Sequence, residues 1–316
     1  MDLSVLLATY CRAEILNRTL GSFCSLDTQG LKWEVLIVDN ANDIKTREVI
    51  NHYRNKLPIK YLLETRRGKN NALNKAIEVA KGILVVFTDD DVIADCNWLK
   101  EMWEGSKRWS GYSVFGGRIL PKFPERKKIP ISEETSFFKF AYVVADWNID
   151  EGPYPAENVW GPNMAIRAST FHQGWRFNPC VGPDGDNYIA GGETELVTKL
   201  EKEGLKAVFL PKCLVYIQIY QKQLEIEWLC RRAFIRGRTD VWNSGEVRVP
   251  LVLGVPRYLV RELMGTYVKR IISLFKNERS LELAIDSWRI KGMIYQYRRK
   301  CFKEASNTKI HVSSKP

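Results

Sequence analysis

The sequence predicts an α/β protein with a mostly parallel sheet flanked by helices, and its first half has a Rossmann-like alternation of strands and helices. Short apolar runs alternate with amphipathic helical segments from the N-terminus to about residue 116. This alternation predicts parallel strands joined by right-handed crossovers. One of the runs, residues 84–87, leads into three consecutive carboxylates, Asp89 to Asp91. Open α/β sheets bind their ligands at the carboxyl ends of such strands.

The composition is that of an ordinary globular protein. The 316 residues are 45% hydrophobic and 27% charged, which suits a chain with a full core. Its seven cysteines are scattered and form no Cys-x-x-Cys pair, which argues against a disulfide framework and a zinc site. Because there is no signal-peptide pattern and no apolar run long enough to span a bilayer, we expect a cytoplasmic protein.

The first half predicts regular elements with short connections. We expect strands over residues 3–10, 33–38, 58–63 and 84–87, and helices over 14–26, 43–55 and 70–80. A basic, glycine-containing turn, Arg66 to Asn71, opens the third helix. Such a turn at a helix N-terminus suits phosphate groups.

The second half predicts fewer regular elements. We expect a helix over residues 97–109 and a strand over 112–116. Residues 160–167 are expected to return to the sheet, and residues 206–210 to form its last strand. The proline-rich residues 121–158 are interpreted either as a lid over a bound acceptor or as a surface excursion.

The Asp89–Asp91 triplet is the strongest chemical signal in the chain. Adjacent carboxylates repel one another, and the repulsion raises their pKa values unless a cation or strong donors hold them. A hard divalent ion, Mg²⁺ or Mn²⁺, typically takes one or two carboxylates together with substrate phosphates. The alternative is a solvated acidic turn that caps the next helix. The buried strand before the triplet favours the ligand site.

Several polar groups are expected at the same edge of the sheet as this triplet. They follow strands or open helices there: Thr9, Asp39 and the basic turn Arg66–Lys69. An acid at the end of a second strand commonly binds a ribose or a base. A dinucleotide oxidoreductase would need Gly-x-Gly-x-x-Gly after the first strand. Because residues 9–12 hold no glycine, we exclude that class.

Two further acids, Glu193 and Glu195, lie at the start of a predicted helix after a glycine-rich segment. Two residues that are two positions apart cannot share a helix face, so at most one of these acids points into a cleft. The alternative is that both only interact with the helix dipole.

Taken in order, these motifs resemble family 2 glycosyltransferases, which are nucleotide-sugar enzymes with the GT-A fold. The resemblance covers about residues 3–240. It rests on five stretches in the family's order: Thr9-Tyr10-x-Arg12, Val38-Asp39-Asn40, Gly68–Ala76, Thr88–Asp91 and Gly161–Met164. The first stretch departs from the family's pattern, since Cys11 stands where Asn is usual.

The resemblance implies roles for individual residues. Asp91 is the expected ligand of an Mg²⁺ or Mn²⁺ cofactor, and Asp89 is a sugar or ribose contact and a second candidate ligand. The implied contacts to the nucleotide sugar are Thr9, Tyr10, Arg12, Asp39, Asn40, Arg66, Gly68, Lys69, Asn74, Asp89, Asp90 and Asn163.

The catalytic acid motif departs from the family as well. The family usually has Gly-Glu-Asp or Gly-Glu-Glu, and here Gly192 replaces the first acid while Glu193 falls on the position of the base. Glu195 remains the alternative base. The Gln-x-x-Arg-Trp motif is absent, which favours transfer of single sugars over polymer synthesis.

The implied function is an inverting transfer from a nucleoside-diphosphate sugar to a hydroxyl of a glycan or lipid-linked glycan, in cell-surface polysaccharide or glycolipid synthesis. No nucleic-acid partner is expected. The alternative is a non-catalytic nucleotide-sugar-binding or assembly protein that retains the fold.

The C-terminal part predicts a separate, basic region. We expect a catalytic domain over 1–220, basic amphipathic helices over 221–305, and a disordered tail over 306–316. Residues 220–316 hold 20 Lys and Arg against 9 Asp and Glu, which accounts for the whole net charge of +11.

The first long helix of this region is expected over residues 257–275. One apolar face would contain Leu259, Leu263, Tyr267, Ile271 and Leu274. Such a face either packs on the catalytic domain or lies along an anionic membrane, whose lipids attract basic segments. The second interpretation predicts a peripheral protein at the cytoplasmic face of the inner or plasma membrane.

Overall fold

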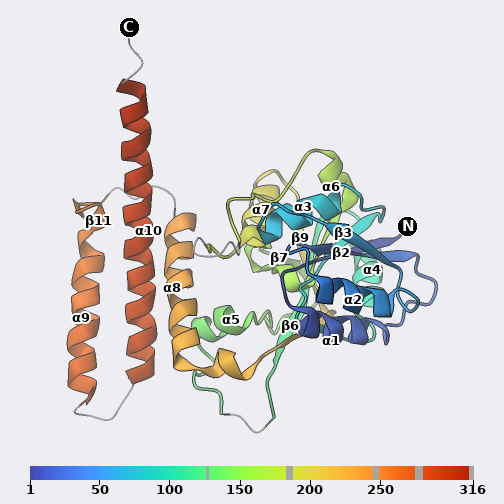
Figure 1. Ribbon diagram of the computed structural model, residues 1–316, viewed down its shortest axis with the longest axis horizontal. Coiled ribbons are helices and arrows are strands. Elements are labelled where there is room, and N and C mark those ends of the chain that lie inside the picture. The colour runs from blue at the N-terminus through green and yellow to red at the C-terminus, as the bar shows by residue number, and fades with distance from the viewer. Residues whose placement is uncertain (126–127, 183–187, 245–248, 275–279, 313–316) are drawn as a thin grey trace. The chain divides into compact units, whose positions relative to one another are not determined.

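The computed structural model describes residues 1–316 except 126–127, 183–187, 245–248, 275–279 and 313–316 (Figure 1). The chain forms two compact units. The first contains Met1–Glu125 and Tyr142–Ile219, and the second contains Arg126–Ala141 and Tyr220–Pro316. The division after Ile219 lies next to the expected boundary at residue 220, but the second unit also takes part of the proline-rich stretch.

A single large sheet forms the centre of the first unit, with the strand order β3-β2-β1-β4-β8-β6-β9-β5 and β7 beside β9. The strands are β1 (Leu3–Thr9), β2 (Trp33–Asp39), β3 (Ile59–Leu63), β4 (Leu84–Phe87), β5 (Val92–Ala94), β6 (Val114–Lys122), β7 (Gly152–Tyr154), β8 (Met164–Arg167) and β9 (Ala207–Gln218). Strands β1 to β4 are parallel, whereas β8 is antiparallel to both β4 and β6. The expected nucleotide-binding half is therefore parallel, and the rest of the sheet is mixed.

The helices of the first unit bring two distant parts of the chain together. They are α1 (Ala13–Phe23), α2 (Ile44–Tyr53), α3 (Lys69–Ile77), α4 (Trp98–Arg108), α6 (Ala168–His172) and α7 (Gly192–Lys202). Leu73 of α3, Leu196 of α7 and Phe87 of β4 belong to one buried apolar cluster. Because this cluster packs α3 and α7 together, their first residues can meet at the carboxyl edge of the sheet.

Strands β6 and β9 run further than the sequence predicts. The expected strands ended near residues 116 and 210, but the observed strands pair as far as Lys122 and Gln218. The sequence misled because Pro121 and Pro211 look like strand ends. In the structure the pairing register shifts between Gly117 and Arg118, opposite Pro211, and an irregularity of this kind tolerates a proline.

The proline-rich stretch and the C-terminal tail also contain more regular structure than expected. Residues 121–158 include α5 (Ser136–Tyr142) and β7. In the second unit, α10 (Ser280–Val312) extends into the tail that was expected to be disordered. No glycine or proline interrupts residues 303–312, so the chain carries no helix-stop signal there. Residues 313–316 lie outside the described part.

The second unit contains long helices that pack closely. Besides α10 it holds α8 (Ile226–Asn243), α9 (Arg257–Leu274) and a two-stranded hairpin of β10 (Leu251–Val252) and β11 (Val255–Pro256). A Cβ atom at Gly237 of α8 would collide with the carbonyl oxygen of Arg289 on α10, and one at Gly292 of α10 would collide with the carbonyl oxygen of Phe234. The two glycines therefore let the backbones of α8 and α10 approach each other.

We predict that Gly237→Ala destabilises the protein by about 1–3 kcal/mol, because the added methyl group overpacks the contact between α8 and α10. Gly265→Ala on α9 is the matched control, since nothing lies within 4 Å of its Cβ position. The control should gain about 0.5–1 kcal/mol from the lower conformational freedom of alanine. Urea unfolding followed by circular dichroism measures both values. Equal stability of the two variants would contradict the close approach.

Candidate active site

The backbone of the Asp triplet is fixed from three directions. The Thr19 hydroxyl of α1 donates to the carbonyl oxygen of Asp90 at 2.6 Å, and the Gln218 N–H of β9 donates to that of Asp91 at 2.9 Å. The Thr88 hydroxyl donates to the carbonyl oxygen of Pro162 at 2.9 Å. The three carboxylates therefore project from a rigid turn between β4 and β5.

Arg12 binds two of these carboxylates at once. Its Nη1 lies 2.6 Å from Asp90 Oδ1 and its Nη2 lies 2.8 Å from Asp91 Oδ2. The Thr9 hydroxyl also donates to Asp90, at 2.7 Å. Burial would lower the pKa of Arg12, but the charges of Asp90 and Asp91 outweigh it and raise that pKa. Thr9 and Arg12, which were both expected to contact the nucleotide sugar, thus hold the triplet in place.

Asp90 is the most enclosed member of the triplet, with 3% of its surface exposed. Burial raises the pKa of Asp90 to about 7, although the nearby Arg12 and the Thr9 hydroxyl lower it. Both carboxylate oxygens are occupied by Thr9 and Arg12. The Asp90 side chain therefore supports the turn from inside, and its expected contact with the nucleotide sugar stays a prediction.

Lys69 joins Asp89 of the triplet to Glu193 of α7. Its Nζ lies 2.5 Å from Asp89 Oδ1 and 2.6 Å from Glu193 Oε1. Burial raises the pKa of Asp89, although the charge of the nearby Lys69 lowers it. Burial also favours the neutral form of Glu193, but Lys69 and the hydrogen bonds to the carboxylate outweigh it and lower the pKa of Glu193. Lys69 therefore keeps Glu193 ionised.

The structure separates the two candidate bases. Glu193 faces Lys69, whereas Glu195 accepts hydrogen bonds from Asn178 at 3.2 and 3.3 Å and pairs with Lys199 at 2.6 Å. As expected for residues two positions apart, Glu193 and Glu195 lie on different faces of α7. Glu195, one of the two expected catalytic residues, is engaged away from the triplet.

Two glycines make room for polar side chains near the start of α7, Gly161 for Glu193 and Gly192 for Asn70. A Cβ atom at Gly161 would lie 2.5 Å from Glu193 Oε1, and one at Gly192 would lie 2.5 Å from the Nδ2 atom of Asn70. Asn70 in turn donates to the carbonyl oxygens of Asn178 and Val181, both at 2.8 Å. A side chain in place of Gly192, the glycine at the family's first acid position, would therefore have to displace the Asn70 side chain.

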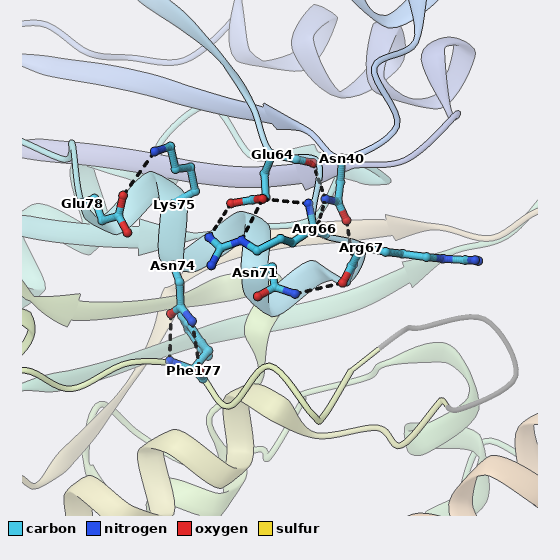
Figure 2. A network of polar contacts seen from close by, with 10 residues as sticks. Asn40, Glu64, Arg66, Arg67, Asn71, Asn74, Lys75, Glu78 and Phe177 are labelled. Atoms are coloured by element: carbon cyan, nitrogen blue, oxygen red, sulfur yellow. Dashed lines mark hydrogen bonds and ion pairs between the residues drawn. The ribbon is translucent and has the colours of Figure 1, made fainter.

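Asn40 holds the basic turn in shape (Figure 2). Its Nδ2 donates to the carbonyl oxygens of Glu64 and Arg66 at 2.7 and 2.8 Å, and its Oδ1 accepts from the Gly68 N–H at 2.8 Å. Gly68 has a φ of 119°, a conformation that favours glycine. Asn40 and Gly68, which were predicted to contact the nucleotide sugar, thus set the start of α3 and, with it, the position of Lys69.

The two arginines of the basic turn point in opposite directions (Figure 2). The Arg66 guanidinium makes two bonds to the Glu64 carboxylate, at 3.0 and 2.7 Å. Arg67 extends the other way, and its guanidinium carbon lies 5.5 Å from the centre of the Tyr10 ring. Arg66 was the expected donor contact. In the structure, Glu64 binds Arg66, and the neighbouring Arg67 lies beside the exposed Tyr10.

Asp39 is fully buried at the end of β2 and shapes the turn that follows. Its carboxylate accepts from the backbone N–H groups of Ala41 and Asp43, both at 2.9 Å, and from the Tyr61 hydroxyl at 3.1 Å. The strand register places Asp39 beside Thr9 of β1, so the expected meeting of these two residues at one edge occurs.

Asn74 and Asn163, two other residues expected to contact the nucleotide sugar, also hold backbone segments in place. Asn74 binds the backbone N–H and carbonyl of Phe177, both at 2.9 Å (Figure 2). Asn163 is fully buried; it donates to the carbonyls of Arg118 and Cys213 and accepts from the Trp98 indole. The Asn163 amide uses both of its N–H groups in these bonds, whereas the Asn74 amide uses one of its two N–H groups. The sequence motif identified their positions but not their partners.

The oxygen groups present fit a hard divalent ion. The side chains of Asp89 and Asp91 are 26% and 17% exposed, and each has one cationic partner, Lys69 or Arg12. In the described part of the chain, no group of three or more His, Cys, Asp or Glu residues could hold a metal by itself. One or two carboxylates supplemented by donor phosphates are typical of Mg²⁺, and Asp89 and Asp91 meet that requirement.

The fold and this acidic edge define a glycosyltransferase of the GT-A class. The model of the family described as "Glycosyl transferase family 2" matches residues 4–174, which is more than half of the chain. The chain belongs to glycosyl transferase family 2.

The curated relatives include glycosyltransferases that are longer than this chain. Validoxylamine A glucosyltransferase of Streptomyces hygroscopicus subsp. jinggangensis is 32% identical over 225 residues, covering 64% of this chain and 52% of its own length. Poly(ribitol-phosphate) beta-N-acetylglucosaminyltransferase TarS of Staphylococcus aureus is 32% identical over 103 residues, covering 32% of this chain and 18% of its own. This chain therefore spans about half the length of the first relative and less of the second.

Solved structures share the fold at low sequence identity. The mannosyltransferase PcManGT from Pyrobaculum calidifontis, in complex with GDP-Man and Mn²⁺, has a TM-score of 0.54 at 19% identity and covers 79% of this chain and 66% of its own. S. aureus TarS in complex with UDP-GlcNAc has a TM-score of 0.52 at 18% identity and covers 75% and 66%. These matches establish the GT-A architecture.

We predict that Lys69→Met destabilises the protein by about 3 kcal/mol at neutral pH, because it leaves two largely buried carboxylates without a cation. In this variant the pKa of Asp89, which burial already raises, should rise further, and the pKa of Glu193 should rise above its unfolded value. The loss should therefore be small near pH 4 and grow as the pH rises.

Thermal unfolding between pH 4 and 8 measures this dependence. Lys75→Met on the same helix is the control, since Lys75 pairs with the exposed Glu78 at 3.4 Å, a pair worth at most about 1 kcal/mol. A pH-independent loss in Lys69→Met would contradict the buried pairing.

Proposed function

We propose that this chain transfers a single sugar, with inversion, from a nucleoside-diphosphate sugar to a hydroxyl group of a glycan or lipid-linked glycan, in cell-surface polysaccharide or glycolipid synthesis. The observation that carries the proposal is the position of Glu193. It is one ionised carboxylate held by Lys69 at the acidic edge, while Glu195 is engaged elsewhere. An inverting transfer needs one general base and no second carboxylate nucleophile.

Glu193 acts as the general base. The acceptor hydroxyl has a pKa far above neutrality, so its proton has to leave as its oxygen attacks the anomeric carbon. The new bond joins the acceptor oxygen to that carbon, and the bond from the carbon to the phosphate oxygen breaks. Its electron pair leaves with the nucleoside diphosphate, and the proton goes to Glu193. Attack opposite the leaving group inverts the anomeric centre.

The leaving diphosphate gains negative charge during this step. Lys69 and Arg67 lie at the start of α3, and a helix N-terminus with basic side chains favours an anion. An Mg²⁺ or Mn²⁺ ion held by Asp91 and Asp89, when bound, would neutralise part of that charge. Tyr10 and the turn shaped by Asp39 and Asn40 then form the expected site for the base and ribose.

The related proteins support a nucleotide-sugar donor without identifying it. Two solved neighbours were obtained with GDP-Man and with UDP-GlcNAc. A thermal-shift screen of nucleoside diphosphates and their sugars with Mn²⁺ identifies the base. Transfer to candidate acceptors, followed by NMR of the product's anomeric proton, then tests inversion. A donor that binds but is neither hydrolysed nor transferred would indicate a non-catalytic binding protein.

Replacing the base should affect turnover and not donor binding. We predict that Glu193→Gln lowers kcat by roughly 10²- to 10⁴-fold, the usual scale for loss of a general base, with nearly unchanged donor affinity. Glu195→Gln is the matched control and should be much milder, because Glu195 binds Asn178 and Lys199. Steady-state kinetics with a fixed acceptor measures both. The opposite ranking would assign the base to Glu195.

Replacing the metal ligand should abolish the metal-dependent part of donor binding. We predict that Asp91→Asn loses turnover and the affinity gain that Mn²⁺ gives to the nucleotide, because the ligand charge is removed. Asp27→Asn, which removes an exposed carboxylate paired with Lys100, is the control and should retain both. Calorimetric titration with and without Mn²⁺ gives the readout. An Asp91→Asn variant with the full Mn²⁺ effect would exclude Asp91 as the ligand.

A further inference from the structure

Helix α9 in the second unit has two apolar faces, and only one of them is covered. Leu259 is fully buried and forms a cluster with Val255 of β11 and Ile290 of α10, against which Leu263 also packs. The sequence predicted one stripe running from Leu259 to Leu274. In the structure its first two residues face α10, so the stripe is not a single exposed face, and the side chain of Leu274 lies outside the described residues.

The second apolar face of α9 points to solvent. It contains Val260, Met264, Tyr267, Val268 and Ile271, which are between 38% and 65% exposed. Their spacing of three, four and seven residues places them on one side of a helix. We call these five residues the outer face of α9. Helices of soluble units usually expose polar residues in this position, so the outer face requires a partner.

The hairpin that precedes α9 exposes further apolar residues. Leu251, Val252 and Leu253 follow one another, and they are 50%, 42% and 84% exposed. Leu253 lies in the turn with a φ of 51°, a left-handed conformation that is unfavourable for leucine. A strained turn that exposes a large apolar side chain to water has no value for the stability of the free protein. Strain of this kind is typical of functional segments.

Basic and aromatic side chains border the outer face. Arg257 and Arg261 lie along its edge in the first turns of α9, and both are exposed. On α10, the Lys291 ammonium lies 5.5 Å from the ring centre of Tyr267 and 4.6 Å from that of the exposed Trp288. Aromatic rings and cations around an apolar helix face are typical of helices that lie in a membrane interface.

We propose that the outer face of α9 and the Leu251–Leu253 turn dock on an anionic lipid bilayer as a peripheral attachment site. The region from residue 220 onward carries the whole net charge of +11, which is complementary to anionic headgroups. A second copy of the chain would bring two such basic regions together, so charge favours lipid over self-association. In the described part of the chain no helix is long and apolar enough to cross a membrane.

The attachment is independent of the proposed reaction and can be tested without any substrate. The 316-residue chain is mixed with vesicles of phosphatidylcholine alone or with about 30% phosphatidylglycerol, which supplies anionic headgroups, and bound protein is separated by flotation. We expect binding to the anionic vesicles at low salt and release at high salt. Failure of this chain to float with anionic vesicles at low salt would overturn the proposal.

Matched variants assign the binding to α9. Met264→Gln/Val268→Gln removes apolar surface without changing charge and should lower partitioning about tenfold or more. Ile44→Gln/Ile83→Gln is the control, because both isoleucines are well exposed in the first unit, and it should bind as the unmodified protein does. Arg257→Gln/Arg261→Gln should lower partitioning about fivefold for each charge.

Circular dichroism and light scattering complete the test. Because all substituted residues are exposed, the variants should retain helix content, and a folded Met264→Gln/Val268→Gln variant with full vesicle binding would overturn the assignment. If the unmodified protein is oligomeric in solution, ignores vesicles, and becomes monomeric in this variant, the outer face binds a second copy and the membrane proposal is wrong.

Discussion

The two ion pairs of Lys69 are the contacts on which the candidate active site depends. Removing an ammonium and two carboxylates from water is costly, and the arrangement persists because both acids reach the same Nζ atom. The acids come from distant parts of the chain, the β4–β5 turn and the start of α7. They meet because the core cluster of α3, α7 and the sheet brings these starting points together. Core packing thus determines the charge state of Glu193.

Asparagine side chains hold the loops around this centre. A side-chain amide carries both donors and an acceptor, so one residue can join two backbone segments. Asn40 fixes the basic turn, Asn70 and Asn74 fix the segment after Phe177, and Asn163 joins β6 to β9. Each is buried or partly buried in a network of backbone groups. These asparagines therefore shape the loops around the candidate site through bonds to backbone groups.

The sequence predicted the parallel half of the sheet and the meeting of Thr9, Asp39 and the Asp triplet, because strand periodicity and the carboxyl-edge rule are local signals. It could not predict which polar residues face a ligand. Asn74 and Asn163 have the same residue type whether they bind a sugar or a backbone carbonyl, and only the fold decides. Arg66 and Arg67 are adjacent and chemically identical, and the difference between them comes from Glu64.

The extents of β6 and β9 also depended on distant partners. Pro121 and Pro211 end strands on local criteria, and only the register shift opposite Pro211 shows why the pairing continues. On α9 the apolar residues are too numerous for one face, so periodicity alone did not separate the side that contacts α10 from the side that contacts solvent. The packing of Leu259 against Ile290 makes that distinction.

The contact between Gly192 and Asn70 couples two positions that are far apart in the sequence. In a homologue with a side chain at position 192, the residue at position 70 would have to shift or be smaller, because a Cβ atom at Gly192 would lie 2.5 Å from Asn70 Nδ2. The two sites should therefore covary through the family's evolution. A smaller residue at position 70 would release the carbonyls of Asn178 and Val181, so a gain of an acid would come with a looser loop. The absence of the first acid in this chain and the bonds that hold its Asn178–Val181 loop thus both follow from the close approach of Gly192 to Asn70.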